Sequence, residues 1–351
     1  MQISFYPYLT QFKMFEFMNG KSPLVSVIIP VYNVEEYIER SITCILSQTY
    51  SNIELILVND GSLDNSLNVM ERYSDRCVII NKENGGASTA RNEGIRCSNG
   101  KYLYFMDADD VIANNAIELL VDNMETHNSD MCCFRYKTID SYGNESILGS
   151  NYSYTYINNQ ECIIKDALLV KNIKTAPWSR IYRTDIIKNN GIFFIDGIIN
   201  EDSVFTDMLV PRLNVVTFIN DVLYTIEQRG GSVSRTYNSR YITSYFNNYK
   251  IVKEYYKSMG LYNKYRNYIQ CQYVTSVLFA LVSIAFGVKN FTAFKELYSY
   301  LNRENFYNNS LLSNVKLKGY SYYFLSLLSY CPIIFYLTMR SLKFIGIKRY
   351  C

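Results

Sequence analysis

Three carboxylates in the first third of the chain are the residues best suited to metal chemistry. Residues 102–106 are apolar or aromatic and predict a buried strand, and Asp107, Asp109 and Asp110 follow it directly. Asp107 and Asp109 are two residues apart, so on an extended backbone both side chains face the same way. Unless a cation neutralises them, such neighbours are costly. The spacing indicates a divalent ion with oxygen ligands that also binds phosphate, whereas a helix N-cap is the alternative explanation.

The elements that must position these carboxylates form an alternating pattern. Apolar runs at 24–31, 53–58, 78–80 and 102–106 predict strands, and the first reads as a central strand covered on both faces. Helical spacing lies between them, at 34–46, 64–73 and 87–95. Strands that alternate with helices predict a doubly wound, mainly parallel sheet of the α/β class.

Ligands of such sheets bind at the carboxyl ends of the strands, and the distinctive polar residues fall there. Tyr32 and Asn33 follow the first strand, Asp60 follows the second, and residues 84–91 follow the third. This edge combines an aromatic ring, an acceptor carboxylate, the cation Arg91 and the carboxylate pair. No P-loop or dinucleotide fingerprint accompanies them, which disfavours both of those nucleotide sites.

Bulk composition excludes several other functions. The 351 residues are 48% hydrophobic, ample for a core, and a net charge of +3 gives no nucleic-acid signal. The nine cysteines are scattered and odd in number, which favours reduced thiols in a cytoplasmic protein. His127 is the only histidine and no C-x-x-C pair occurs, so a zinc site is disfavoured.

Five runs in the first half resemble the nucleotide-sugar half of family 2 glycosyltransferases, which are inverting enzymes of the GT-A fold. The runs are Val27–Asn33, Val58–Ser62, Glu83–Ser88, Ala90–Asn92 and Asp107–Asp110. The resemblance implies a Rossmann-like, mainly parallel sheet in a catalytic domain at 24–235. Its nucleotide-binding half would be 24–112 and its acceptor half 113–235, after a weakly structured leader at 1–23 and before a helical region at 236–351.

The resemblance also implies roles in binding a UDP-sugar donor. Asp60 would accept the imide N–H of uracil, and Arg91 would lie near the base or the diphosphate. Asp107 would lie near the ribose, and Asp109, with Asp107, would hold Mn²⁺ or Mg²⁺ against the diphosphate. The implied nucleotide-sugar site comprises Pro30, Tyr32, Asn33, Asp60, Asn84, Gly86, Arg91, Asp107 and Ala108.

The acceptor half carries the implied catalytic base. Inverting transfer needs one base to take the acceptor hydroxyl proton, and the resemblance places it at Asp202 first and Glu201 second. The alternative is that both merely charge the start of a helix running to residue 209. Trp178, the only tryptophan, would either stack on a sugar or pack in the core. Arg229 would close over the diphosphate, although Glu227 stands where a second Arg is common in the family.

The C-terminal region concentrates positive charge. Six basic residues and no acidic residue follow position 315, so the first 315 residues are net negative. Residues 319–339 carry no charge, which favours a basic, interfacial membrane anchor over a spanning helix. A helical bundle or a homo-oligomer interface is the alternative.

The resemblance therefore implies an inverting, metal-dependent glycosyltransferase that moves a sugar from a UDP-sugar to a hydroxyl of a glycan or lipid-linked glycan acceptor. The expected setting is polysaccharide or glycolipid synthesis, with peripheral contact at the cytoplasmic membrane face. One rival is a catalytically silent, membrane-associated protein that binds nucleotide sugars. A sugar nucleotidyltransferase is disfavoured because residues 30–33 are not a basic, glycine-rich loop.

Overall fold

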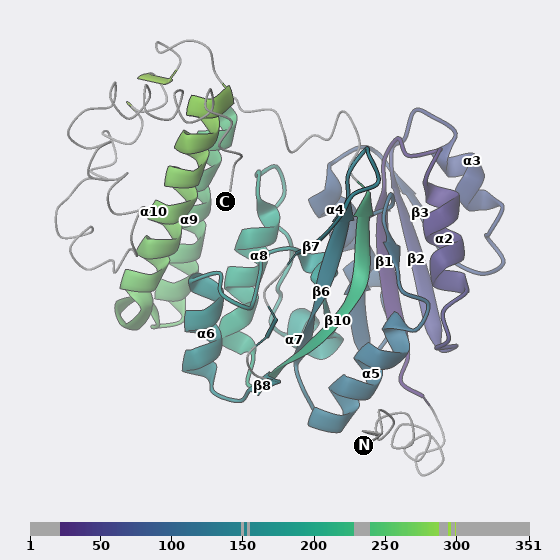
Figure 1. Cartoon of the computed structure of the whole chain (residues 1–351), viewed down its shortest axis with the longest axis horizontal. Helices are drawn as coiled ribbons and strands as arrows, with labels where there is room; N and C mark the ends of the chain where they lie inside the picture. Colours follow the sequence, from purple (N-terminus) through teal and green to yellow (C-terminus); the bar gives the residue numbers. More distant parts are fainter. Residues whose placement is uncertain are drawn as a thin grey trace. The chain divides into compact units, whose positions relative to one another are not determined.

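The computed structural model describes residues 22–148, 151–152, 155–227, 239–287, 294–295 and 299. These residues fall into two compact units. The first contains the sheet and most of residues 22–227, and the second contains 168–171, 198–200 and the helices from residue 239 onward (Figure 1).

The first unit is built on one mixed, mainly parallel sheet, which confirms the predicted fold class. Its strand order is β3-β2-β1-β4-β9-β6-β10-β5, with β7 paired to β6 and β8 to β10. Strands β1 to β4 are parallel, and β9 runs antiparallel to both β4 and β6. The strands are β1 (Val25–Val31), β2 (Ile53–Asp60), β3 (Val78–Lys82), β4 (Tyr102–Phe105), β5 (Val111–Ile112), β6 (Met131–Ile139), β7 (Glu145–Leu148), β8 (Tyr156–Ile157), β9 (Arg180–Arg183) and β10 (Val216–Glu227).

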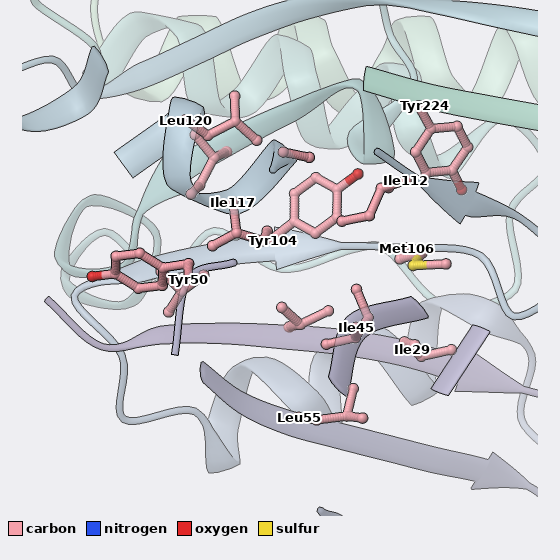
Figure 2. Close-up of a cluster of buried hydrophobic side chains, with 14 of the residues drawn as sticks. Ile29, Ile45, Tyr50, Leu55, Tyr104, Met106, Ile112, Ile117, Leu120 and Tyr224 are labelled. Atoms are coloured by element: carbon pink, nitrogen blue, oxygen red, sulfur yellow. The ribbon is translucent and has the colours of Figure 1, made fainter. Parts of the chain in front are cut away.

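Helices cover both faces of this sheet because the central strands are apolar on both sides. On one face, α2 (Ile38–Leu46) and α5 (Ala116–His127) share a buried cluster with alternate residues of β1, including Ile29, and with Tyr104 of β4 (Figure 2). On the other face, α4 (Ala87–Cys97) lies so close to β1 that a Cβ on Gly94 would stand 2.3 Å from the Ile28 side chain. The remaining helices of this unit are α3 (Ser66–Glu71), α6 (Gln160–Leu168), α7 (Thr184–Asn189) and α8 (Glu201–Leu209).

An aromatic cluster fixes α8 against β4. Phe205 of α8 stacks on Phe194 with a centroid distance of 4.1 Å, and Phe105 of β4 meets both rings edge-on. All three side chains are buried, and edge-to-face packing of this kind stabilises by about 0.5–1.5 kcal/mol per pair beyond the area buried. Since Phe105 is the last residue of β4, the cluster holds the start of α8 near the carboxylates that follow this strand.

Two strands of this sheet have features that local sequence patterns do not specify. The apolar runs at 215–219 and 222–226 belong to the single strand β10. The pairing of β10 with β6 shifts register around residues 218–224, so the strand continues through the exposed polar residues Asn220 and Asp221. The strand that follows the turn at 142–144 is β7, which pairs antiparallel with β6. Asp140 accepts hydrogen bonds from the backbone of residues 142 and 144, which closes a tight turn just before the return strand.

The described part of the second unit is mainly a pair of helices, α9 (Ser239–Ser258) and α10 (Tyr262–Gly287). Tyrosine rings join them, with Tyr249 stacked on Tyr273 at 4.5 Å. None of the helices within the described ranges is long and apolar enough to cross a membrane. The basic residues beyond position 315, on which the membrane prediction depends, lie outside the described residues.

Candidate active site

Strand register brings the predicted donor-site residues to one edge of the sheet. At the end of β2, Asn59 lies opposite Val31 of β1, and Asp60 lies opposite Lys82 of β3. Asp60 is therefore flanked by Tyr32, which follows β1, and by the end of β3. On the other side of β1, Ile28 lies opposite Phe105, and Asp107 follows two residues later. The sheet thus gathers the carboxyl ends of β1 to β4, where parallel sheets bind ligands.

Arg91 of α4 joins the predicted metal pair to the predicted base. One terminal nitrogen, Nη2, lies 3.1 Å from Oδ1 of Asp107. The other, Nη1, lies 3.1 Å from Oε1 of Glu201 and 3.4 Å from Oδ1 of Asp202. The guanidinium also packs over the Phe194 ring at 5.2 Å. Residues that are up to 111 positions apart in sequence therefore converge on one cation, which we call the Arg91 cluster.

In the Arg91 cluster, one buried cation is surrounded by three partly exposed carboxylates. The Arg91 side chain is only 7% exposed, whereas those of Glu201, Asp202 and Asp107 are 21%, 31% and 34% exposed. Burial alone would lower the pKa of Arg91, but Asp202, Asp107 and Glu201 outweigh it and raise that pKa above its ordinary value. One guanidinium thus balances three carboxylates, which leaves this cluster net negative and able to attract a further cation.

Asp202 has the properties of a proton acceptor near neutral pH. Burial has the largest influence and raises the pKa of its carboxyl to about 7, while Arg91 pulls that pKa down and the charges of Glu201 and Asp107 push it up. An ordinary Asp has a pKa near about 3.9 and is a weaker base. Matching of pKa to working pH is the usual property of a general base, so Asp202 remains the first choice.

Asp60 lies at the centre of a tight polar network. Its Oδ1 accepts hydrogen bonds from Lys82 Nζ at 2.6 Å and from the Gly85 N–H at 3.0 Å. Its Oδ2 accepts the Gly86 N–H at 2.7 Å, and Asn84 donates to its backbone carbonyl at 2.9 Å. Gly86 has φ of +89°, a conformation that suits glycine and opens α4. Among the residues described, Oδ2 has this single donor, so its second lone pair is unused, and the Asp60 side chain is 3% exposed.

The loop after β1 is bound to the loop after β2. The Asn33 N–H donates to Ser62 Oγ at 3.1 Å, and the Leu63 N–H donates to Asn33 Oδ1 at 2.8 Å. Asn33 has φ of +50°, which Asn tolerates better than most residues. The neighbouring Tyr32 is 46% exposed, so its ring is accessible at the edge while Asn33 holds the backbone beneath it.

The carboxylate pair fits a metal that is completed by its substrate. Asp107 and Asp109 supply oxygen ligands of the type that Mg²⁺ and Mn²⁺ prefer. Over the described ranges, no group of three or more His, Cys, Asp or Glu side chains is placed to hold a metal ion by itself. Mg²⁺ in particular is usually bound by one or two carboxylates together with substrate phosphates, so two carboxylates fit such an ion.

Other predicted site residues have structural contacts. Trp178 stacks on Tyr224 at 4.6 Å and 16°, and Tyr136 meets it edge-on at 4.6 Å. Trp178 thus packs against the core cluster, and its predicted contact with a sugar stays a prediction. Ala108 is buried and its carbonyl accepts from Ser41 Oγ at 2.8 Å. Arg229 lies outside the described residues.

Sequence reasoning missed two residues of this region. Lys82 ends β3 directly beside Asp60, and a cation at a strand end next to a buried carboxylate was a usable signal. Tyr224 contacts the backbone of Asp107 from β10, but nothing distinguishes it among 34 tyrosines.

The fold is thus a mixed, mainly parallel sheet with a carboxylate pair after β4 and an acidic pair at the start of α8. Comparison with known proteins agrees. The family model "Glycosyl transferase family 2" matches residues 26–190. The glycosyltransferase GlyG of Streptococcus pneumoniae is 30% identical over 232 residues, covering 61% of this chain and 74% of GlyG. The chain belongs to glycosyltransferase family 2 and is a glycosyltransferase.

Two further comparisons show the limits of this similarity. GlyA of S. pneumoniae is 30% identical over 232 residues, which are 62% of this chain but only 32% of GlyA. Among solved structures, TarS 1–349 from S. aureus has a TM-score of 0.68 at 20% identity and covers 93% of both chains. A structure of the same TarS fragment in complex with UDP-GlcNAc has a TM-score of 0.60. At this identity the TarS comparison establishes the fold.

Proposed function

We propose that the protein is an inverting, metal-dependent glycosyltransferase that moves a sugar from a UDP-sugar to a hydroxyl acceptor. The main support for this function is the Arg91 cluster. In it, one cation links Asp107 of the metal pair to Asp202 and Glu201, the two candidates for the base. A metal–diphosphate site and a proton acceptor must flank the same anomeric carbon in an inverting transfer, and this cluster brings their residues together.

Uracil recognition is assigned to Asp60 and Tyr32. The remaining lone pair of Asp60 Oδ2 suits the imide N–H of uracil, which is a donor where cytosine has an acceptor. The exposed Tyr32 ring is a planar partner for the base. The TarS fragment in complex with UDP-GlcNAc shares this fold, which supports a uridine nucleotide as the donor. Pro30, Asn33, Asn84 and Gly86 would complete the pocket.

In the transfer step, the acceptor oxygen attacks the anomeric carbon on the face opposite the diphosphate. Asp202 takes the proton from that hydroxyl, a new C–O bond forms, and the bond to the diphosphate oxygen breaks so that UDP leaves with the electron pair. Glu201 and Arg91 orient the base. When bound by Asp107 and Asp109, Mn²⁺ or Mg²⁺ would neutralise the departing diphosphate.

The wider setting is assigned from the sequence. The acceptor would be a glycan or lipid-linked glycan in polysaccharide or glycolipid synthesis, at the cytoplasmic face of the membrane. The basic C-terminal region would supply peripheral membrane contact, and self-association through that region is the alternative use of its apolar stretch.

Lys82→Met should weaken UDP binding about tenfold and should also lower stability, because Asp60 is a buried carboxylate that loses its cation. The change removes the cation that fixes Asp60 Oδ1 and leaves that buried carboxylate with its two backbone donors. Calorimetric titration of UDP measures the effect. Lys101→Met is the matched control, because Lys101 also pairs with a carboxylate, that of Glu125, at the opposite end of β4. Equal UDP affinity in both variants would contradict the role of Lys82.

The function itself is tested by titrating UDP into the protein with Mn²⁺, with a chelator, and with Asp109→Ala. We expect binding that needs Mn²⁺ and that Asp109→Ala reduces at least tenfold, since one of two carboxylate ligands is lost. Asp185→Ala, an exposed acidic residue on α7, is the control. Binding of another nucleotide in place of UDP would move the base assignment, and absence of nucleotide binding would refute the donor site.

A catalytically silent nucleotide-sugar-binding protein is the alternative. Such a protein would bind UDP as above without transferring a sugar from any of a panel of UDP-sugars. The raised pKa of Asp202 beside the metal pair favours the enzyme, because a silent site has no need of a tuned base.

A further inference from the structure

The backbone of residues 107–110, which we call the acidic turn, is held by side chains from outside it. Ser41 Oγ on α2 lies within hydrogen-bond distance of the carbonyls of residues 108 and 110, at 2.8 and 2.9 Å. Arg40 Nη2 donates to the carbonyl of residue 109 at 3.0 Å. The N–H of residue 110 closes the turn onto the carbonyl of residue 107 at 3.2 Å. The turn that carries both predicted metal ligands is therefore fixed in shape.

Tyr224 reaches both ends of the acidic turn with one hydroxyl. Its oxygen accepts the N–H of Asp107 at 3.1 Å, and its O–H donates to Asp110 Oδ2 at 2.8 Å. A phenol can do both at once because it carries one donor and an acceptor oxygen. Asp110 is 5% exposed, so this donor satisfies a carboxylate that would be costly to bury alone.

Aromatic packing fixes where that hydroxyl lies. The Tyr224 ring is fully buried and belongs to the cluster shown in Figure 2, where it lies beside Ile112. Trp178 stacks on it, and the Trp178 carbonyl in turn accepts the Tyr104 hydroxyl at 3.0 Å. The ring comes from β10 in the predicted acceptor half, whereas the acidic turn follows β4 in the nucleotide-binding half. Tyr224 thus connects the two halves of the sheet at the metal pair.

We propose that Tyr224 is a positioning residue for the metal–diphosphate site, acting through the acidic turn. This inference rests on the metal-dependent transfer proposed above. The hydroxyl fixes the backbone from which the Asp107 side chain starts and anchors Asp110 one residue after Asp109, so both carboxylates are oriented before an ion arrives. Partners that orient metal ligands in this way typically change metal affinity about 10–100-fold when they are removed.

The test compares Tyr224→Phe with Tyr102→Phe. Each change removes one buried phenol that donates to a carboxylate, and the Tyr102 hydroxyl bonds to Glu125 Oε1 at 2.5 Å at the far end of β4. The readout is the Mn²⁺ concentration that gives half-maximal UDP binding at fixed UDP, measured by calorimetry, together with the melting temperature. For Tyr224→Phe we expect about a tenfold increase in that Mn²⁺ concentration. For Tyr102→Phe we expect a comparable loss of melting temperature and an unchanged Mn²⁺ requirement.

Each other result decides against the inference in a distinct way. An unchanged Mn²⁺ requirement in Tyr224→Phe would overturn the positioning role while leaving the proposed function intact. Equal increases in both variants would also overturn it, because the effect would then be general destabilisation. A wild-type protein without Mn²⁺-dependent UDP binding would overturn the proposed function and, with it, this inference.

Discussion

Arg91→Met should give a protein that is inactive and destabilised by about 3 kcal/mol at neutral pH. Removing one partner of a buried ion pair typically costs about 3–5 kcal/mol, because the remaining charge is left without compensation. Here three carboxylates lose their shared cation, but they keep between 21% and 34% of their side-chain surfaces exposed, which puts the cost at the lower end. Met preserves much of the side-chain volume, so packing against Phe194 contributes little to the loss.

The pH dependence of this loss has a defined sign. Burial and neighbouring carboxylates already raise the folded-state pKa of Asp202 to about 7, and removing Arg91 raises it further. A carboxyl with a raised folded-state pKa binds more protons in the folded state, so its contribution to stability falls as pH rises above the unfolded value of about 3.9. The difference in unfolding free energy between Arg91→Met and the wild type should therefore be largest above pH 7 and narrow as pH falls.

Urea unfolding at several pH values, with and without Mn²⁺, measures both effects. Millimolar Mn²⁺ should stabilise Arg91→Met more than the wild type, because the uncompensated carboxylates attract the ion. Arg96→Met is the matched control: Arg96 is on the same helix, pairs with Glu93 and packs over the Phe193 ring, but it is 52% exposed. Its loss should be below about 1 kcal/mol. Similar losses in the two variants would contradict the buried role of Arg91.

The central strands of this fold could be predicted from the sequence because buried parallel strands are continuous apolar runs. The predicted strands at 24–31 and 53–58 correspond to β1 and β2 within two residues, and the helix expected to run to residue 209 is α8. The bulge in β10 and the early return at β7 were not readable in this way. The bulge depends on how β10 pairs with β6, and the early return depends on the hydrogen bonds that Asp140 accepts. Neither depends on the periodicity of the segment itself.

The types of the site residues were predicted from the sequence, but several of their contacts were not. Arg91 was expected near the base or the diphosphate, and the structure adds that it spans three carboxylates from two distant segments. That convergence follows from the packing of α8 on β4 through Phe105, Phe194 and Phe205, which no local pattern encodes. Tyr224 is similar, since a hydroxyl that bridges a turn is indistinguishable in sequence from a tyrosine that only fills the core.

Asp202→Asn should reduce sugar transfer about 100- to 10,000-fold while leaving Mn²⁺-dependent UDP binding within a few-fold of the wild type. General base catalysis contributes in this range, and Asn cannot accept the hydroxyl proton. Glu201→Gln should lose less, because Glu201 orients the cluster without taking the proton. Release of UDP from a UDP-sugar that the wild type turns over measures transfer, and calorimetry measures binding.

Two observations distinguish a catalytic role of Asp202 from a role in stabilising the start of α8. If Asp202 only stabilised the start of α8, Asp202→Asn would cost about 0.3–1 kcal/mol of stability and little activity. Asp185→Asn, in the first turn of α7, provides that outcome as a control. The wild type should also lose kcat/KM as pH falls through about 7, because Asp202 must be deprotonated to act. If kcat/KM stayed flat down to pH 5, or if Asp202→Asn kept full activity, the base would have to be reassigned to Glu201.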